Sequence, residues 1–288
     1  MKAWFITGAS RGIGALITAE ALKAGDSVIA TARDASAISA EFKGTPRVLA
    51  IPFDVTHEAQ ARKAAAQAVE RFGRIDVLVN NAGYGLLGAI EEASATEVEQ
   101  VFSTNVFGLL NVTRAVLPYM RAQRSGHVIN MSSIGGYASS QGWGIYCATK
   151  FAVEAISESM SLELEPLGVH TTVVEPGYFR TEFLSTTSLK STATRIEDYA
   201  ATVGAMRTFA AGADKQQPGD PAVLARNIVK LVRTPQPPRR MPFGSDTVRK
   251  IEEKNREVEA ELGQWREFAL STDFVEASGP PRGSSGLA

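Results

Sequence analysis

The sequence has a single cysteine, Cys147, and only three histidines among its 288 residues. One cysteine excludes a disulfide within the chain and leaves no cysteine cluster to bind a metal ion. A lone thiol beside Tyr146 is expected to pack in the core rather than to react. No metal site is therefore predicted.

The sequence also lacks a large net charge of either sign and lacks long apolar runs. The 30 basic and 31 acidic side chains give a formal net charge of −1, which provides no attraction for nucleic acid or for an anionic membrane. No segment approaches the ~20 apolar residues that span a bilayer. Residues 1–14 read as a strand and a turn rather than as a secretory signal. We therefore expect a cytoplasmic protein that binds neither nucleic acid nor membrane.

Apolar segments alternate with stretches of helical periodicity along most of the chain. With 44% hydrophobic and 21% charged residues, the chain is long enough for a substantial core. The alternation predicts a single α/β domain with a Rossmann-type, doubly wound parallel sheet covered by helices on both faces. Its seven strands are expected at residues 2–7, 27–31, 48–52, 75–80, 127–131, 171–175 and 240–243.

A glycine-rich turn follows the first of these strands. Gly8, Gly12 and Gly14 lack the β-carbons that would keep a pyrophosphate from the backbone, and the helix that follows offers unpaired N–H groups. The spacing differs from the usual G-x-G-x-x-G fingerprint of dinucleotide-binding proteins. The turn is a candidate phosphate site formed by Gly8, Ser10, Arg11, Gly12, Ile13 and Gly14.

Tyr146 and Lys150, four residues apart, would share one face of a helix. A phenol titrates near pH ~10 and is a poor acid or base at neutrality. A neighbouring ammonium group that stabilises the phenolate would make the tyrosine a usable general acid or base. The same spacing also fits an exposed helix whose lysine extends to solvent, so the pair alone does not identify a site.

The sequence TGASRGIG at residues 7–14, combined with Tyr146 and Lys150, resembles the short-chain dehydrogenase/reductase family. The resemblance covers residues 1 to about 245, and the motifs occur in family order. It adds the family's NNAG element at Asn80, Asn81, Ala82 and Gly83, its asparagine at Asn105, its catalytic serine at Ser133, and a nicotinamide-side element at Pro176, Gly177 and Thr181.

The resemblance implies hydride transfer between a nicotinamide cofactor and a carbonyl compound or secondary alcohol. In the reductive direction, Tyr146 would donate its proton to the carbonyl oxygen, and Ser133 would hydrogen-bond the same oxygen. Lys150 would lower the pKa of Tyr146 and hydrogen-bond the nicotinamide ribose, and Tyr146 would also contact the cofactor. Asn105, through its main chain, would hold a water molecule that links Lys150 to solvent.

The choice between NADP(H) and NAD(H) depends on the end of the second strand, where the adenosine ribose lies. Family members that use NAD generally have an acid there, whereas this chain has alanine followed by Arg33. Arginine suits a 2′-phosphate, and Arg11 offers a second positive charge, so NADP(H) is favoured. NAD(H) stays open because a two-residue shift would place Asp34 at the ribose. Asp54 and Val55 resemble the family's adenine contacts, although Asp54 also fits a simple turn.

The resemblance also divides the chain. Residues 1–250 would form the catalytic domain, with the family's substrate lid at about 184–215, where the strand and helix pattern breaks. Residues 251–277 have apolar side chains at helical spacing, which predicts a C-terminal amphipathic helix that packs in the core or against another subunit. Residues 278–288 are rich in glycine, proline and serine and are expected to be disordered.

The substrate is expected to be a small molecule with apolar character. Family members commonly form dimers or tetramers, so a homodimer or homotetramer is also expected. Apolar residues near the expected cleft favour a medium-sized apolar ketone or secondary alcohol. These residues, some of which must serve packing alone, are Leu86, Leu87, Tyr137, Trp143, Tyr178, Phe179 and Phe183.

Two other functions are weighed against this one. Residues 8–12 also fit the G-x-S-x-G turn of serine hydrolases, with Ser10 as nucleophile. A hydrolase would need a histidine, and His57, His127 and His170 read as structural or surface residues. A cofactor-binding sensor on the same fold is the second alternative, but a sensor has no evident use for a complete set of catalytic side chains.

Overall fold

The structure, a computed structural model, describes residues 1–42 and 44–274. Seven strands form one sheet in the order β3-β2-β1-β4-β6-β7-β9, and every neighbouring pair is parallel. The predicted doubly wound sheet is confirmed, with strand ends shifted by at most two residues. The strands are β1 (Ala3–Thr7), β2 (Ser27–Ala32), β3 (Val48–Pro52), β4 (Val77–Asn80), β6 (Gly126–Met131), β7 (Val169–Pro176) and β9 (Arg240–Phe243).

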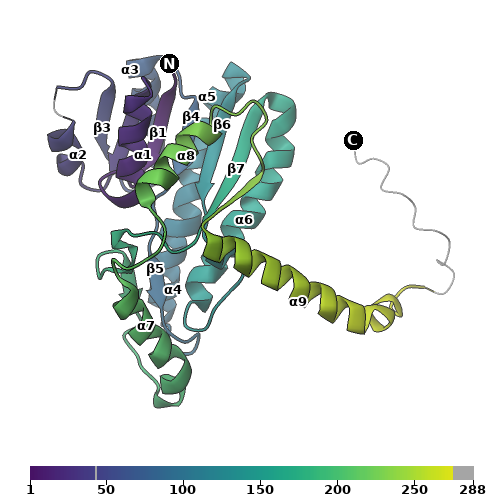
Figure 1. Ribbon diagram of the computed structural model, residues 1–288. Helices are drawn as coiled ribbons and strands as arrows, with labels where there is room; N and C mark the ends of the chain where they lie inside the picture. Colours follow the sequence, from purple (N-terminus) through teal and green to yellow (C-terminus); the bar gives the residue numbers. More distant parts are fainter. Residues whose placement is uncertain (43, 275–288) are drawn as a thin grey trace.

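Helices cover both faces of this sheet (Figure 1). Side chains alternate along β1 between the two layers, so that Trp4 and Ile6 pack on one side, and Ala3 and Phe5 on the other. A strand buried on both faces reads as a near-continuous apolar run, which makes it visible in the sequence. One layer contains α1 (Gly12–Lys23), α2 (Ser36–Glu41) and α8 (Pro221–Leu231), and the other contains α3 (Glu58–Phe72), α5 (Leu109–Gln123) and α6 (Gly144–Leu164).

The strand order reverses at β1, which pairs with β2 on one side and β4 on the other. In doubly wound sheets, ligands bind in the crevice at such a reversal, outside the carboxyl ends of the strands. The glycine turn lies at this crevice because it follows β1 directly.

A π-helical turn interrupts the long helical segment that precedes β6. α4 (Ala95–Phe102) begins with a capping box, in which the Glu97 carboxylate accepts from Ser94 N at 2.8 Å. It continues through the π-helical turn Ser103–Gly108 into α5. Such turns occur often at functional sites, and this one contains the buried Asn105.

A small two-stranded parallel sheet joins the lid to the body. β5 (Gly85–Leu87) pairs with β8 (Leu189–Ser191), which lies inside the segment predicted as the lid. Three-residue strands with a partner distant in the chain have no local pattern, so the sequence does not indicate this pairing. The remaining lid structure consists of short helices at Glu182–Leu184, Glu197–Tyr199 and Ala200–Gly204, followed by α7 (Ala205–Ala213).

The C-terminal helix α9 (Ser245–Leu270) begins six residues before the predicted position and extends away from the body (Figure 1). The expectation of core packing is wrong for most of it, because Val258, Leu262, Trp265 and Phe268 are 47–72% exposed. Packing against another subunit stays a prediction. The predicted disordered tail at 278–288 lies outside the described residues. Among the residues described, no helix is both long and apolar enough to cross a bilayer.

Candidate active site

The glycine turn after β1 has a backbone that only glycine readily adopts. Gly8 and Gly12 have φ angles of +64° and +56°. A β-carbon at Gly14 would lie 2.6 Å from Nδ2 of Asn81 and closer still to the carbonyl oxygen of Gly8. The absence of side chains at these positions leaves the N-terminus of α1 accessible to an anionic group.

Asn81 fixes this turn to the loop after β4. Its Nδ2 donates to the carbonyl oxygens of Thr7 and Gly8, at 2.9 and 3.1 Å. The backbone N–H groups of Asn81 and Ala82 both donate to Thr7 Oγ1, at 3.0 Å each. The NNAG element therefore holds together the two loops that flank the crevice.

A cleft of about 1420 Å³ opens at the carboxyl ends of the strands. It exceeds the ~300–1,000 Å³ of a typical single-ligand pocket. Gly14 and Asn105 lie behind its lining and support it. The other residues singled out from the sequence line the cleft, namely Gly8, Ser10, Arg11, Gly12, Ile13, Arg33, Asp54, Val55, Asn81, Ala82, Gly83, Ser133, Tyr146, Lys150, Pro176, Gly177 and Thr181.

Ser133 and Tyr146 meet in the wall of the cleft. The position that a β-carbon of Gly135 would occupy lies 3.6 Å from both Ser133 Oγ and Tyr146 Cε1. Burial raises the pKa of Tyr146, and the hydroxyl of Ser133 acts in the opposite direction. The phenol is therefore protonated at neutral pH.

Lys150 lies one helical turn after Tyr146 on α6 and is buried. Its Nζ donates to the carbonyl oxygen of Met131 at 2.8 Å and lies 5.8 Å from the centroid of the Tyr146 ring. Burial lowers the pKa of Lys150 to about 8, against the opposing effect of the Glu154 charge. We expected Lys150 to lower the pKa of Tyr146. That effect stays a prediction, and burial of the phenol is the main reason why the pKa of Tyr146 is raised.

Asn105 anchors the loop that faces Lys150. Its Oδ1 accepts from Tyr84 N at 3.1 Å, and its Nδ2 donates to Tyr84 O at 3.0 Å and to Thr149 Oγ1 at 3.1 Å. Gly83 lies between the two side chains, since a β-carbon there would be 3.1 Å from Asn105 Oδ1 and 3.7 Å from Lys150 Nζ. The Asn105 side chain thus fixes the loop, separately from the main-chain role that the resemblance implies.

Arg33 and Asp34, at the end of β2, both border the cleft. Asp34 Oδ1 accepts from Ser36 N at 2.9 Å, and this hydrogen bond lowers the pKa of Asp34. Burial would raise the pKa of Asp54, but hydrogen bonds from Thr56 outweigh it, and the charge of Arg33 adds to the lowering. Arg33 is therefore close enough to Asp54 to act on it, whereas Asp34 and Asp54 both stabilise turns.

Asp246, at the start of α9, shapes the loop after β7 and was missed in the sequence. Its carboxylate accepts from Tyr178 N at 2.7 Å, and any side chain at Gly177 would overlap it. Thr181 Oγ1 caps the next short helix by accepting from Phe183 N at 3.2 Å. The only signal for Asp246 was its place just after the last predicted strand.

A family model described as short chain dehydrogenase matches residues 2–192. The chain belongs to the short-chain dehydrogenase family. Among similar proteins, Oxidoreductase BOA17 from Botryotinia fuckeliana (strain B05.10) is 36% identical over 273 residues, which cover 94% of this chain and 99% of the relative. A 3-ketodihydrosphingosine reductase from Bacteroides thetaiotaomicron is 39% identical over 240 residues, which cover 83% of this chain and 86% of the relative.

Solved structures agree with this membership. A short-chain dehydrogenase from Streptomyces avermitilis has a TM-score of 0.88 at 39% identity, with 95% of this chain and 100% of that chain covered. A serine dehydrogenase complexed with NADP+ in its closed form has a TM-score of 0.71 at 26% identity, with 84% and 94% covered. The short-chain dehydrogenase described here is thus an oxidoreductase with the complete fold of its relatives.

The cleft wall of this short-chain dehydrogenase is aromatic beside Tyr146. The rings of Trp143 and Phe183 each lie 5.6 Å from the Tyr146 ring, centroid to centroid. Tyr178 and Phe179, which follow β7, also line the cleft. The cleft wall around Tyr146 is therefore largely apolar and aromatic.

Three other apolar residues named from the sequence have packing roles instead. Leu86 and Leu87 belong to β5 and are buried. Tyr137 donates its hydroxyl to Asn255 Oδ1 of α9 at 2.6 Å. Cys147 is buried against the same aromatic cluster as Tyr146, as expected for a packing residue.

The histidines of this dehydrogenase do not form a hydrolase site with Ser10. His127 and His170 lie near the amino-terminal ends of β6 and β7, at the sheet edge opposite the glycine turn. His127 is buried, with Nε2 2.9 Å from Thr172 Oγ1, and burial lowers its pKa to about 3. His57 is the exposed N-cap of α3 and does not line the cleft. The hydrolase interpretation has no support in this geometry.

The lid is attached at both of its ends. Near its start, Arg11 Nη2 donates to Thr187 O at 3.1 Å and to Ser188 Oγ at 3.0 Å. The guanidinium that we assigned to a phosphate therefore contacts the lid in this structure. The lid thus touches the glycine turn directly.

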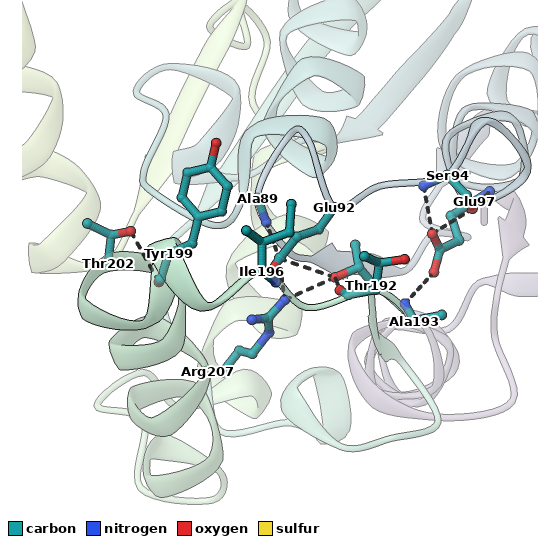
Figure 2. Close-up of polar contacts among 11 residues, drawn as sticks. Ala89, Glu92, Ser94, Glu97, Thr192, Ala193, Ile196, Tyr199, Thr202 and Arg207 are labelled. Carbon is teal, nitrogen blue, oxygen red and sulfur yellow. Dashed lines mark hydrogen bonds and ion pairs between the residues drawn. The ribbon is translucent and has the colours of Figure 1, made fainter.

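Two carboxylates hold the other end of the lid (Figure 2). Glu92, whose side chain is fully buried, accepts from Ile196 N at 2.9 Å and pairs with Arg207 at 2.5 Å. Glu97 accepts from Ala193 N at 2.9 Å. Both acids precede or begin α4, so the lid is fixed to the segment that leads to Asn105.

We expect Glu92→Gln to loosen the lid. Burial alone would raise the pKa of Glu92, but hydrogen bonds from Arg207, Ile196 and Ala89 lower it to about 2. The carboxylate therefore stabilises the lid fully above its ordinary pKa of 4.5, and this stabilisation is lost as the pH falls toward 2. Breaking a buried ion pair costs roughly 3 kcal/mol, so amide exchange at Ile196 should accelerate about 100-fold at neutral pH.

The control for this variant is Glu91→Gln. Glu91 is the exposed neighbour of Glu92 and accepts only from the Tyr199 hydroxyl, at 2.7 Å, among the described contacts. Exchange at Ile196 should stay at the wild-type rate in the control. Equal exchange in both variants would show that Glu92 does not hold the lid.

Proposed function

We propose that this short-chain dehydrogenase reduces medium-sized apolar ketones with NADPH. The observation that carries the proposal is the joint placement of Ser133, Tyr146 and Lys150 in one cleft. The glycine turn enters the same cleft and offers a helix N-terminus without obstructing side chains. A dinucleotide phosphate fits this environment because the turn supplies backbone N–H groups and close approach.

Bound NADPH would supply a hydride to the carbonyl carbon. Tyr146 donates its phenolic proton to the carbonyl oxygen. Ser133 hydrogen-bonds that oxygen, and the loss of such a donor costs roughly 3 kcal/mol in other oxyanion sites. Lys150 stabilises the phenolate that remains and hydrogen-bonds the cofactor ribose.

The preference for NADP(H) over NAD(H) rests on Arg33. Its guanidinium borders the cleft near the end of β2, while Asp34 is engaged by Ser36. We expect Arg33→Ala to raise KM for NADPH about 30-fold, since a charged hydrogen bond contributes roughly 2 kcal/mol. KM for NADH should not change. Initial rates with both cofactors provide the measurement.

Asp34→Asn is the matched variant that tests the alternative, a preference for NADH. If Asp34 bound the ribose hydroxyls of NADH, this variant would weaken NADH binding and spare NADPH. That outcome, together with an unchanged KM for NADPH in Arg33→Ala, would contradict the preference. Serine dehydrogenase, a relative of this chain, holds NADP+ in its crystal structure.

The substrate proposal rests on the aromatic wall. Trp143, Tyr178, Phe179 and Phe183 offer apolar area but few hydrogen-bonding groups. One relative is a 3-ketodihydrosphingosine reductase, whose name includes a ketone. The test is NADPH consumption with ketones of increasing apolar size, compared with polar and phosphorylated carbonyl compounds. Turnover confined to the polar set would contradict the proposal.

We also propose a homodimer or homotetramer formed through the helices that contain Asn105 and Tyr146. Phe107, Phe151 and Leu162 lie on those helical segments and are 45–58% exposed. Exposed aromatic and aliphatic side chains of this kind favour burial against a second copy. Mass measurement by light scattering tests the oligomer, and a monomer at micromolar concentration would contradict it.

A further inference from the structure

Two acidic side chains that the proposed chemistry does not use are buried behind Lys150. Glu154 follows Lys150 by one turn of α6, and Glu175 lies near the end of β7. They are only 5% and 1% exposed, and neither lines the cleft. Carboxylates are rarely buried to this extent unless a partner compensates their charge.

A single arginine, Arg240, contacts both carboxylates. Nη1 of Arg240, on β9, donates to Glu154 Oε2 and lies 3.4 Å from Glu175 Oε1. Nη2 of the same guanidinium donates to Glu158 Oε2 at 2.8 Å. Glu158 is 62% exposed, so water screens its charge. The two buried acids therefore converge on a single nitrogen.

The charges of this cluster do not balance if every acid is ionised. Glu154 and Glu175 would then both place a full negative charge at Nη1 of Arg240, while water screens the charge of Glu158. Two carboxylates at one site tend to retain one proton between them because like charges repel. Burial raises the pKa of both Glu154 and Glu175, and the charge of Glu175 raises that of Glu154 further.

Glu154 also contacts the loop that carries Ser133. A β-carbon at Gly136 would lie 3.0 Å from Glu154 Oε1 and closer still to Ser132 Oγ. Both oxygens are buried, and neither has a well-formed hydrogen bond among the described residues. The negative charge of Glu154 raises the pKa of Lys150, against the effect of burial. Glu154 therefore lies against the loop that carries Ser133 and also raises the pKa of Lys150.

We propose that Glu154 and Glu175 share one proton, and that the negative charge left on the pair keeps Lys150 protonated. Both carboxylates are then positioning residues for the Tyr146 and Lys150 pair. A shared proton leaves one negative charge on the buried pair, beside the single guanidinium nitrogen that both acids contact. The effect on catalysis rests on the proposed function, whereas the shared proton does not.

Infrared spectroscopy tests the shared proton without any substrate. A protonated carboxyl group has a carbonyl band that is separate from carboxylate bands, and we expect one buried carboxyl band at pH ~6, well above the pKa of an ordinary glutamate. Glu154→Gln and Glu175→Gln should each eliminate it, because the remaining acid ionises beside Arg240. Glu158→Gln, which alters the exposed contact to the same arginine, should retain it. A band that persists in both buried variants would overturn the shared proton.

The pH dependence of ketone reduction tests the link to Lys150. Reduction needs a proton on both Tyr146 and Lys150. We therefore expect kcat/KM to fall at alkaline pH, when Tyr146 and Lys150 together lose one proton. In Glu154→Gln the remaining negative charge lies on Glu175, whereas it is the charge of Glu154 that raises the pKa of Lys150. Tyr146 and Lys150 should therefore release a proton more readily in this variant. In Glu154→Gln we expect the alkaline limb to move to lower pH by roughly one unit. Glu158→Gln should match the wild type.

Glu154→Asp keeps the charge and should restore the wild-type limb, which separates charge from folding. An unshifted limb in Glu154→Gln would overturn the role in positioning. If the infrared pattern is as expected while the wild type reduces no ketone, the proposed function fails and the shared proton stands. If ketones are reduced but the band persists in both buried variants, the shared proton fails and the function stands.

Discussion

Tyr146→Phe is expected to lower kcat for ketone reduction about 1,000-fold, within the range that a general acid contributes. The phenylalanine ring keeps the packing against Trp143 and Phe183 but has no proton to donate. NADPH affinity should change little, because the glycine turn and Arg33 are untouched. The measurement is initial-rate kinetics together with NADPH binding by fluorescence.

Tyr137→Phe is the matched control. It removes the same hydroxyl from a tyrosine in the same wall region, but that hydroxyl bonds Asn255 rather than lining the cleft. Its kcat should remain within a few-fold of the wild type. Loss of NADPH binding in Tyr146→Phe would assign Tyr146 to cofactor binding instead of proton transfer.

Gly14→Ala is expected to weaken NADPH binding at least 100-fold. The new β-carbon would overlap Asn81 Nδ2 at 2.6 Å and approach the carbonyl oxygen of Gly8 more closely still. The turn and the loop after β4 would have to separate, because Asn81 holds both. Displacement of the N–H groups at a helix N-terminus removes the geometry that binds phosphate. Equilibrium binding of NADPH provides the measurement.

Gly263→Ala is the control for this substitution. Gly263 lies in the exposed part of α9, and a β-carbon there meets nothing within 4 Å. Alanine favours helices over glycine by up to ~1 kcal/mol, so this variant should be slightly more stable and bind NADPH as the wild type does. Wild-type affinity in Gly14→Ala would show that the cofactor phosphates lie elsewhere.

The sheet was predictable because its strands are buried on both faces. β1 is apolar at its first four positions, residues 3–6, so a run of apolar residues was enough to find it. β5 and β8 were not predictable, because each is three residues long and depends on a partner far along the chain. The start of α9 was also missed because it depends on a distant contact. The carboxylate of Asp246, in the first turn of α9, accepts a hydrogen bond from Tyr178 in the loop after β7.

The candidate site likewise has features that local spacing predicts and features that depend on tertiary packing. Tyr146, Lys150 and the glycine turn have fixed spacings, and the structure brings them into one cleft. Spacing does not reveal burial, and so the raised pKa of Tyr146 was not foreseen. Glu154 was not singled out from the sequence, because its burial beside Arg240 of β9 depends on a strand far along the chain.

The most direct test of carbonyl reduction uses NADPH with deuterium at the C4 position of the nicotinamide. Wild-type enzyme is incubated with an apolar ketone that it accepts, and the alcohol product is analysed by mass spectrometry. We expect one deuterium on the carbinol carbon for each NADPH consumed, and none when Tyr146→Phe is used under the same conditions. Tight NADPH binding without deuterium in the product of any ketone would contradict the reductase and favour a cofactor sensor.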